Sequence, residues 1–566
     1  MIYILADNIL SPLGNTTEQN YQALKDGCSV LQRYEHFRGV PEPYVASLFT
    51  EEQLSAVQTE GLTLFESLVV ASAKRAIGSV GLDVKQKKVI FILSSTKANI
   101  ELLEQGNSTD DEFPGVCAER IAKAIGVTTM PITVCNACIS GVSAIILAER
   151  LLESKLYDYA IVSGADRQTR FVISGFQSFK AVSDELCRPF DIERLGLNLG
   201  EAVATMILSA NKDTKDECWG VARGAIRNDA YHISAPSKKG EGALLALNAV
   251  CKGRDIDGLA FVNAHGTATM FNDQMESVAI ERASLTDIPV NGLKGYYGHT
   301  LGAAGILETI ISARSCDDGL VLGTKGFGEL GVSGKIRVSD SHQPCRKTGF
   351  LKMISGFGGC NAAVWVTKDS VENQKDNYAA SIRATHHVTI TPETVVLDEK
   401  EIHVDKTGKD LIVQLYKTCI GDYPKFYKMD KLSRLGFVAS ELLLAKEDRR
   451  RFEECEDRAI ILFNRSASVD TDKLYLKSIS DDDYFPSPSL FVYTLPNIVS
   501  GEIAIRNLYH GETSFYVLPS RNDRLMKQIV EVSVGGDMTR SAICGWIDYE
   551  NEQRFVADLF IIEKQS

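Results

Sequence analysis

Apolar segments predict an alternation of buried strands and helices through the first two thirds of the chain. The opening MIYILADNIL, PITVC at 131–135 and YAIVSGAD at 159–166 are short apolar runs with the composition of buried strands. Between the last two runs, apolar positions recur at helical spacing, at Val142, Ile145 and Ile146. The pattern predicts a strand, a helix and a second strand in direct succession.

Two later segments repeat the order of strand, loop and helix. LAFVNAHGTATMFNDQMESVAI, at 259–280, is a buried strand that ends at His265 and is followed by a Gly/Thr loop and a helix. NGLKGYYGHTLGAAGILETIISA, at 291–313, places Lys294 and His299 in a loop before a helix of small residues. We therefore expect the two histidines to occupy similar positions in the fold.

Cys138, within VCNACISG, stands where the predicted strand gives way to the predicted helix. A sharp strand-to-helix turn lifts a side chain out of the sheet and aims it into a cleft. The helix N-terminus pushes a nearby thiol toward thiolate, and the backbone N–H of the same residue can help to hold an oxyanion. Cys135 lies inside the strand, where a small buried apolar residue is the better interpretation.

The CxxC spacing of the two cysteines is also typical of zinc sites and of redox motifs. A zinc site usually needs two such pairs, and the chain has no second CxxC, no CxxH and no HxxxH. A thioredoxin-like redox motif belongs to a domain of different length and pattern. Taken alone, Cys138 fits simple packing equally well, but a cysteine and two histidines at related turns form a candidate catalytic constellation.

Composition and charge narrow the class of protein. The 566 residues are 44% hydrophobic and 24% charged, typical of a soluble protein with several domains. The net charge of −13, without a Lys/Arg block, argues against nucleic acid, and no apolar run approaches the ~18 residues of a membrane helix. With 13 cysteines and no secretion signal, we expect reduced thiols and a cytoplasmic location.

Seven motifs in order then identify a family. They are LSPLGN, NACISG, RPFDIERLGLNLGEA, NDAYHISAP, NAHGTATMFNDQME, LKGYYGHTLGAAG and SGFGGCNAA. Together they resemble the β-ketoacyl synthases, the condensing enzymes of fatty acid and polyketide synthesis, over roughly residues 1–368. The resemblance implies an α/β, thiolase-like fold of two similar halves in α/β/α/β/α layers. The nucleophile half would span 1–240 and the histidine half 241–368, with the active site between them.

The resemblance also implies roles for individual residues. Cys138 matches the acyl-accepting nucleophile, and His265 and His299 match the pair that polarises a malonyl thioester and promotes its decarboxylation. Lys294 and Glu308 match the charged network that supports them.

Other matches concern the substrate path. The oxyanion hole would use the backbone N–H groups of Cys138 and Ser355, and the pantetheine channel would be lined by Thr267, Thr269 and Phe357. Ser355 stands where the family commonly has a gating phenylalanine, so bulky or rigid acyl chains are expected to enter, unless another ring fills the space.

Asp273 and Glu276 fit the family's acidic signature, with Asn272 in place of its glycine, and are interpreted as structural.

The implied activity is a decarboxylative Claisen condensation of an acyl thioester with malonyl carrier protein, in fatty acid or polyketide/aryl-polyene-type synthesis. The partner would be an acyl carrier protein, whose phosphopantetheine arm is the only cofactor implied, and no metal is expected. The main alternative is a non-catalytic chain-length or scaffold subunit. A thiolase is a weaker third reading, because thiolases use a second cysteine where this chain has His299.

The remaining residues predict a linker at 369–380 and a degenerate third half at 381–566. A shift of 382 residues places Ile121 on Ile503 and YAIVSGAD on SAICGWID, but it places Cys138 on Ser520. This half, without catalytic residues, resembles the inactive partners called chain-length factors; an unrelated α/β domain is the alternative. Besides an ordinary homodimer, we expect an intramolecular pseudo-dimer through the edge strands YAIVSGAD and SAICGWID.

Overall fold

The computed structural model describes residues 1–106, 109–212, 218–368, 380–447, 451–480 and 484–565. The predicted linker lies outside these ranges except for its last residue. In the ranges given, no helix has the length and apolar character needed to span a membrane.

The first part of the chain forms a five-stranded mixed sheet. Its strands are β1 (Ile2–Leu10), β4 (Val89–Ser94), β5 (Ile132–Val134), β6 (Tyr159–Asp166) and β8 (Ala202–Ser209). The spatial order is β5-β4-β6-β8-β1, with β4 parallel to β5 and β6, and β8 antiparallel to β6 and β1. The three apolar runs predicted as strands are β1, β5 and β6.

A second sheet repeats this arrangement. It contains β9 (Gly220–Asn228), β10 (Leu259–Asn263), β11 (Pro289–Asn291), β15 (Gly349–Gly356) and β16 (Cys360–Thr367). The order β11-β10-β15-β16-β9 has the same parallel and antiparallel senses as the first sheet. Strands β1 and β9 pair where the two units meet.

The C-terminal part forms a third sheet with the same topology. Its strands are β17 (Ile382–Ile390), β20 (Arg458–Asn464), β21 (Thr513–Val517), β22 (Ser541–Asn551) and β23 (Arg554–Lys564). They lie in the order β21-β20-β22-β23-β17, again with three parallel and then two antiparallel neighbours. The chain therefore contains three copies of one α/β unit.

A shared polar contact supports the equivalence of the first and third units. Asp166, at the end of β6, accepts hydrogen bonds from the backbone N–H of Thr96 and the hydroxyl of Ser95. Asp548, in β22, likewise accepts from the backbone N–H and hydroxyl of Ser466. Each aspartate ties its strand to the loop that follows the neighbouring parallel strand.

Helices α6 (Ser140–Glu153) and α11 (Ala304–Asp317) form the central layer between the first two sheets. Nearly every residue of α6 is buried, as expected for a helix covered on all sides. The two helices approach closely at Gly305, which has no side chain to keep them apart. A Cβ at this position would lie only 2.6 Å from the backbone nitrogen of Val142. With outer helices on the far faces, this gives the α/β/α/β/α layering that the sequence predicts.

The remaining helices cover the sheets. The outer helices are α3 (Leu64–Val80), α5 (Pro114–Ile125), α8 (Glu241–Cys251) and α9 (Met270–Arg282). In the third unit they are α12 (Gly408–Leu415), α13 (Lys431–Leu444), α14 (Val469–Leu476), α15 (Pro488–Tyr493), α16 (Ile498–Asn507) and α17 (Asp523–Gly535). Shorter elements include α1 (Thr17–Lys25), α2 (Glu51–Val57), α4 (Ile100–Glu104), α7 (Arg170–Ser178) and α10 (Lys294–Tyr297).

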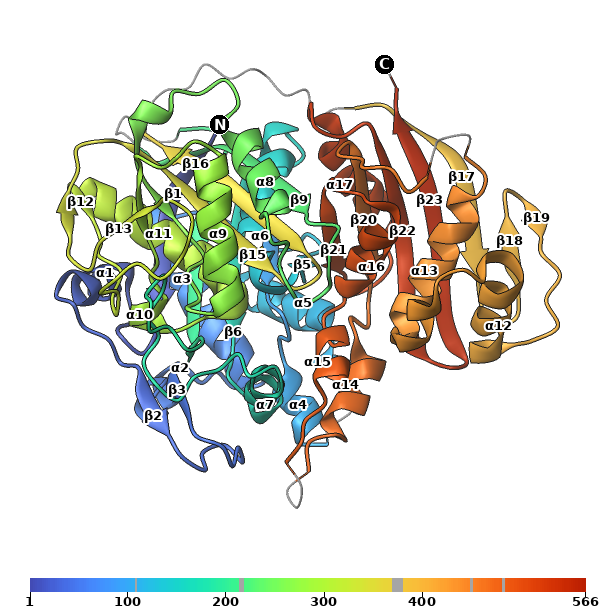
Figure 1. Cartoon of the computed structure of the whole chain (residues 1–566), viewed down its shortest axis with the longest axis horizontal. Coiled ribbons are helices and arrows are strands. Elements are labelled where there is room, and N and C mark those ends of the chain that lie inside the picture. Colours follow the sequence, from blue (N-terminus) through green and yellow to red (C-terminus); the bar gives the residue numbers. More distant parts are fainter. Residues whose placement is uncertain (107–108, 213–217, 369–379, 448–450, 481–483, 566) are drawn as a thin grey trace.

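The third unit docks on the first through paired edge strands. β21 runs antiparallel to β5, with Tyr516 opposite Val134 and Val517 opposite Thr133, so the two sheets are continuous (Figure 1). The predicted use of YAIVSGAD and SAICGWID as edges is wrong. These strands are β6 and β22, and each lies between two strands of its own sheet. The edge of the first sheet is instead β5, the strand before the nucleophile turn, and its outer backbone groups pair with β21.

A buried ion pair crosses the same seam. Arg150, in α6, donates two hydrogen bonds to the carboxylate of Glu512, at 3.0 and 2.7 Å, and both side chains are almost fully buried. Ser533 and Ser514 add polar contacts to the pair. Removing one partner of such a pair is strongly destabilising, because the other charge is left buried and uncompensated.

We expect Glu512→Gln to destabilise the protein by about 3–5 kcal/mol, because it leaves the Arg150 charge buried without its carboxylate. Urea unfolding measures the effect. Glu552→Gln, which removes an exposed carboxylate paired with Lys409, is the control and should leave the unfolding midpoint unchanged. Equal midpoints for both variants would contradict the assigned role of the buried pair.

Candidate active site

Cys138 lies on a tight turn between β5 and α6. A short 3₁₀ turn, Ala137–Ile139, joins the strand to the helix, and Ala137 has a φ of 48°. Ser140 holds the turn by accepting from the N–H of Asn136 and donating to the carbonyl of Ala137. The half-buried thiol of Cys138 opens onto a cavity of about 400 Å³. By contrast, Cys135 is buried, as packing requires.

His265 follows β10 and is held by acidic residues of α9. Its backbone N–H donates to Glu276 at 2.6 Å, and the N–H of Gly266 donates to the other oxygen at 2.8 Å. Asp273 accepts from the N–H of Thr267 at 3.0 Å. The two carboxylates therefore shape the loop that presents His265.

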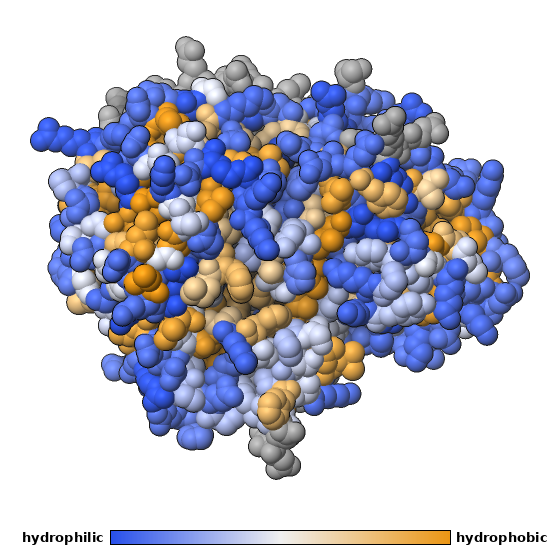
Figure 2. Space-filling view, viewed as in Figure 1, coloured by the Kyte–Doolittle hydropathy of each residue, from blue (hydrophilic) through white to orange (hydrophobic). Residues whose placement is uncertain are grey.

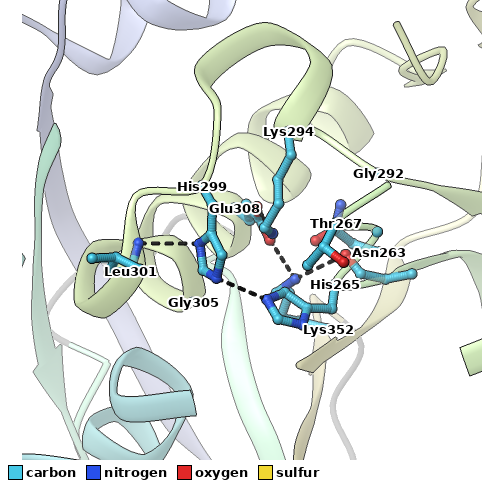
Figure 3. Close-up of polar contacts among 12 residues, drawn as sticks. Asn263, His265, Thr267, Gly292, Lys294, His299, Leu301, Gly305, Glu308 and Lys352 are labelled. Carbon is cyan, nitrogen blue, oxygen red and sulfur yellow. Dashed lines mark hydrogen bonds and ion pairs between the residues drawn. The ribbon is translucent and has the colours of Figure 1, made fainter. Parts of the chain in front are cut away.

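The structure brings Cys138, His265 and His299 together. Sγ of Cys138 and one ring nitrogen of each histidine lie within 4.8 Å of one another. The two Nε2 atoms are 3.1 Å apart (Figure 3). Nδ1 of His299 accepts from the N–H of Leu301 at 3.1 Å, so its proton must be on Nε2. That proton is donated to Nε2 of His265, whose own proton is consequently on Nδ1.

The tautomers favour an oxygen acceptor over a metal at this spot. A cation would need lone pairs on both Nε2 atoms and a deprotonated thiol. The N–H of Leu301 instead keeps a proton on Nε2 of His299. The side chain of Asn272 interacts with the buried imidazole of His265. Transfer of the His265 proton from Nδ1 to Nε2 would let the pair present two N–H donors.

Two lysines and a glutamate lie behind the histidines. Lys294 and Lys352 each donate to Glu308, at 2.7 and 2.5 Å, and all three side chains are buried (Figure 3). Lys294 belongs to the single turn α10 rather than to a loop, which corrects the sequence interpretation. Lys352 was missed, although a single lysine in the apolar strand GFLKMISG was a visible signal.

Burial, helped by the lysines of this network, keeps the histidines neutral. Burial alone would raise the pKa of Glu308, but Lys294 and Lys352 hold it below its usual range. Burial lowers the pKa of both His265 and His299 well below the usual value, and the charge of Lys294 adds to the effect. Neutral imidazoles at physiological pH are suited to donating hydrogen bonds to a developing negative charge.

The remaining predicted residues line the same cavity. The hydroxyls of Thr267 and Thr269 are 2.8 Å apart, and the hydroxyl of Ser355 donates to Asn361 at 2.6 Å. The ring of Phe357 packs against two rings of the α7 region, Phe176 and Phe179, at 6.2 and 5.5 Å between centroids. The cavity wall near Ser355 is therefore aromatic even though position 355 is small.

Apolar side chains surround the cavity mouth. Leu195, Met270 and Phe271 line it and are 64%, 54% and 76% exposed. Figure 2 shows apolar surface on this face of the molecule, which carries α9. Large exposed apolar residues gathered at a site entrance are typical of a surface that receives a partner.

The fold and this site define a condensing enzyme of the thiolase-like class. Residues 1–214 match the family model of the β-ketoacyl synthase N-terminal domain, and residues 220–327 match that of the C-terminal domain. The chain belongs to the β-ketoacyl synthases, which are condensing enzymes of the acyltransferase type.

Relatives and solved structures agree with this assignment. The chain is 28% identical over 415 residues to a 3-oxoacyl-(acyl-carrier-protein) synthase 2 of Vibrio cholerae, covering 64% of this chain and 98% of the relative. A ketosynthase solved with its chain length factor, from Xenorhabdus doucetiae, covers 65% of this chain and 97% of its own (24% identity, TM-score 0.56). The keto synthase-chain length factor of PfaC covers 100% of this chain and 78% of its own (13% identity, TM-score 0.76), which shows a shared fold.

Alkylation of Cys138 should become faster throughout the neutral and mildly alkaline range. Burial raises the pKa of this thiol to about 12, although Lys294 opposes the shift, so the thiolate expected from the helix N-terminus is not favoured in the free enzyme. Because only the thiolate reacts, we expect the rate with iodoacetamide to rise about tenfold per pH unit from about pH 6.5 to 9 without a plateau. Peptide mass spectrometry measures alkylation at Cys138, and a short unstructured peptide with one cysteine, whose rate levels off near a thiol pKa of ~8.5, is the control. A plateau below about pH 8 would instead indicate a thiolate paired with a protonated histidine.

Proposed function

We propose that the chain condenses an acyl thioester with malonyl carrier protein by decarboxylative Claisen chemistry. The observation that carries this proposal is the convergence of one thiol and two neutral imidazoles at the end of one cavity. The relatives named as 3-oxoacyl-(acyl-carrier-protein) synthases support it. The pathway we favour is fatty acid or polyketide/aryl-polyene-type synthesis.

The first half-reaction transfers the acyl group to Cys138. The sulfur attacks the acyl thioester carbonyl, the carrier thiol leaves, and the proton lost by Cys138 ends on that thiol. The backbone N–H groups of Cys138 and Ser355 are the proposed donors to the tetrahedral oxyanion. Gly356, next to Ser355, lies against the backbone amide of Cys138. A Cβ on Gly356 would be 3.2 Å from the Cys138 nitrogen.

The second half-reaction forms the carbon–carbon bond. Loss of CO₂ from the malonyl group leaves its electron pair as an enolate, which attacks the acyl carbonyl and expels the Cys138 thiolate. His299 already carries an Nε2–H, and His265 becomes the second donor once its proton moves from Nδ1 to Nε2. Two donors aimed at the enolate oxygen stabilise charge where it develops.

The carrier protein supplies the only cofactor required. Its phosphopantetheine arm would enter past Thr267 and Thr269, while the carrier itself meets the apolar mouth formed by Leu195, Met270 and Phe271. A solved type II acyl-carrier protein complex with its ketosynthase is among the structures that share this fold.

A non-catalytic chain-length or scaffold subunit is the alternative. It has no use for a neutral histidine pair backed by the buried Lys294–Glu308–Lys352 network, whose assembly without function would only destabilise the fold. Activity decides between the two proposals.

We expect Cys138→Ala to abolish acyl-enzyme formation and condensation, because no other thiol faces the histidines within the described residues. Cys135→Ala, in the same strand-turn region, should keep both activities.

His299→Ala should still accept an acyl group on Cys138 but lose malonyl decarboxylation by about 100-fold or more. Intact-mass analysis and CO₂ release measure these steps. Acylation elsewhere, or decarboxylation at the native rate without His299, would refute the assignment.

We propose further that the third unit forms the floor of the acyl tunnel, as a built-in partner in a pseudo-dimer. Phe491, in α15, lies against Gly175 so closely that a Cβ there would be 2.1 Å from its ring. It packs edge-on against Phe176, at 5.5 Å, and beside Phe179, and both of these rings line the cavity. One aromatic cluster therefore spans the cavity wall and the third unit.

Phe491→Ala is expected to lengthen the products by at least one two-carbon unit, because it removes the ring that supports the end of the cavity. Chain length is read by mass spectrometry of the carrier-bound products. Phe437→Ala removes a buried ring inside the third unit that stacks on Tyr423 and not on Phe176 or Phe179, and it should leave product length unchanged. The same product distribution in both variants would show that the third unit does not set chain length.

A further inference from the structure

Asn497, in the third unit, sits at the start of a helix without capping it. It precedes α16, yet its side chain makes no capping hydrogen bond, although asparagine is among the best residues for that role. Instead, its Nδ2 donates to the carbonyl of Phe357 at 2.8 Å and lies 3.7 Å from Sγ of Cys360. The residue is only 4% exposed, so a buried amide is directed across the seam at the synthase.

Its target is the glycine turn between β15 and β16. Gly358 and Gly359 have φ values of +91° and +71°, and a Cβ on Gly358 would lie 2.7 Å from Nδ2 of Asn497. The synthase holds the other side of the turn, since Asn228 donates to the carbonyl of Gly358 at 2.8 Å. This turn continues from the strand that places Gly356 beside the amide of Cys138.

The first unit has no asparagine at the position that corresponds to Asn497 of the third unit. A shift of 382 residues places Asn497 on Gly115, within LPNI and FPGV. Gly115 packs against the backbone of Leu518 and Pro519, where a Cβ would lie 2.4 Å from the carbonyl carbon of Leu518. That part of the third unit follows β21 and carries no nucleophile. Of these two copies, the one that faces the active site carries the polar side chain.

The third unit also contacts the nucleophile turn. The N–H of Phe515 donates to Oδ1 of Asn136 at 2.7 Å, and its carbonyl accepts from the N–H of Cys135 at 3.0 Å. Both segments that meet at Cys138, the nucleophile turn and the glycine turn, are thus held by hydrogen bonds from the third unit.

We propose that Asn497 is a positioning residue for acyl transfer. By holding the carbonyl of Phe357, it keeps the glycine turn in place, and with it Gly356, which lies against the amide of Cys138, a proposed donor to the acyl carbonyl oxygen. This inference rests on the proposed function and deepens it, because it makes the third unit a working part of the active site. The histidine pair is held separately, by Leu301 and by α9.

The test uses the full chain with Asn497→Ala and Asn497→Asp. Misplacing an oxyanion donor by about 1 Å is expected to slow acylation of Cys138 and lower kcat for condensation by about 10- to 100-fold. The KM for malonyl carrier should stay within about two-fold, and malonyl decarboxylation should be unchanged, because it depends on the histidines. Asn497→Asp keeps the shape but loses the N–H donor, so it should be impaired like the alanine variant.

Asn507→Ala is the matched control. Asn507 is buried in the same helix and donates to the carbonyl of Ile503 at 3.0 Å, away from the cavity. It should change thermal stability as Asn497→Ala does while acylating at the wild-type rate. Wild-type acylation in both Asn497 variants, or equal loss of acylation and decarboxylation, would overturn the inference. If the wild-type chain forms no β-ketoacyl product, the proposed function fails, and acylation by a short acyl thioester still tests Asn497.

Discussion

The pairing of β5 with β21 is the constraint on which the rest of the molecule depends. β5 is a three-residue edge strand, and the nucleophile turn follows it directly. An unpaired edge leaves backbone donors and acceptors without partners, and here a strand of the same chain satisfies them. The seam also buries the Arg150–Glu512 pair, so the geometry around Cys138 and the docking of the third unit form one packed region.

Electrostatics impose a second constraint on the site. The histidines are neutral because they are buried beside Lys294 and Lys352, and those lysines are tolerated because Glu308 accepts hydrogen bonds from both. The buried carboxylate thus allows two lysines to lie beside the histidines, while burial, together with the lysine charges, keeps the imidazoles neutral. The backbone N–H of Leu301 then selects the tautomer of His299.

Much of this could be predicted from the sequence, because local patterns carry it. Cys138, His265 and His299 stand at strand-to-helix turns that short apolar runs and small residues mark clearly. The edge strand was assigned wrongly because the spatial order of strands leaves no trace in a single apolar run, and β5 is shorter than β6. Lys352 and Asn497 act through contacts between segments distant in sequence, which neither periodicity nor spacing reveals.

Fusion of the third unit also changes how the assembly responds to dilution. A homodimer of two identical halves separates as its concentration falls, whereas covalently joined partners meet at an effective concentration set by the connecting chain. Each polypeptide thus carries its own interface, and the β5–β21 pairing forms whether the protein is scarce or abundant. The specific activity of such an enzyme is expected to be independent of its concentration.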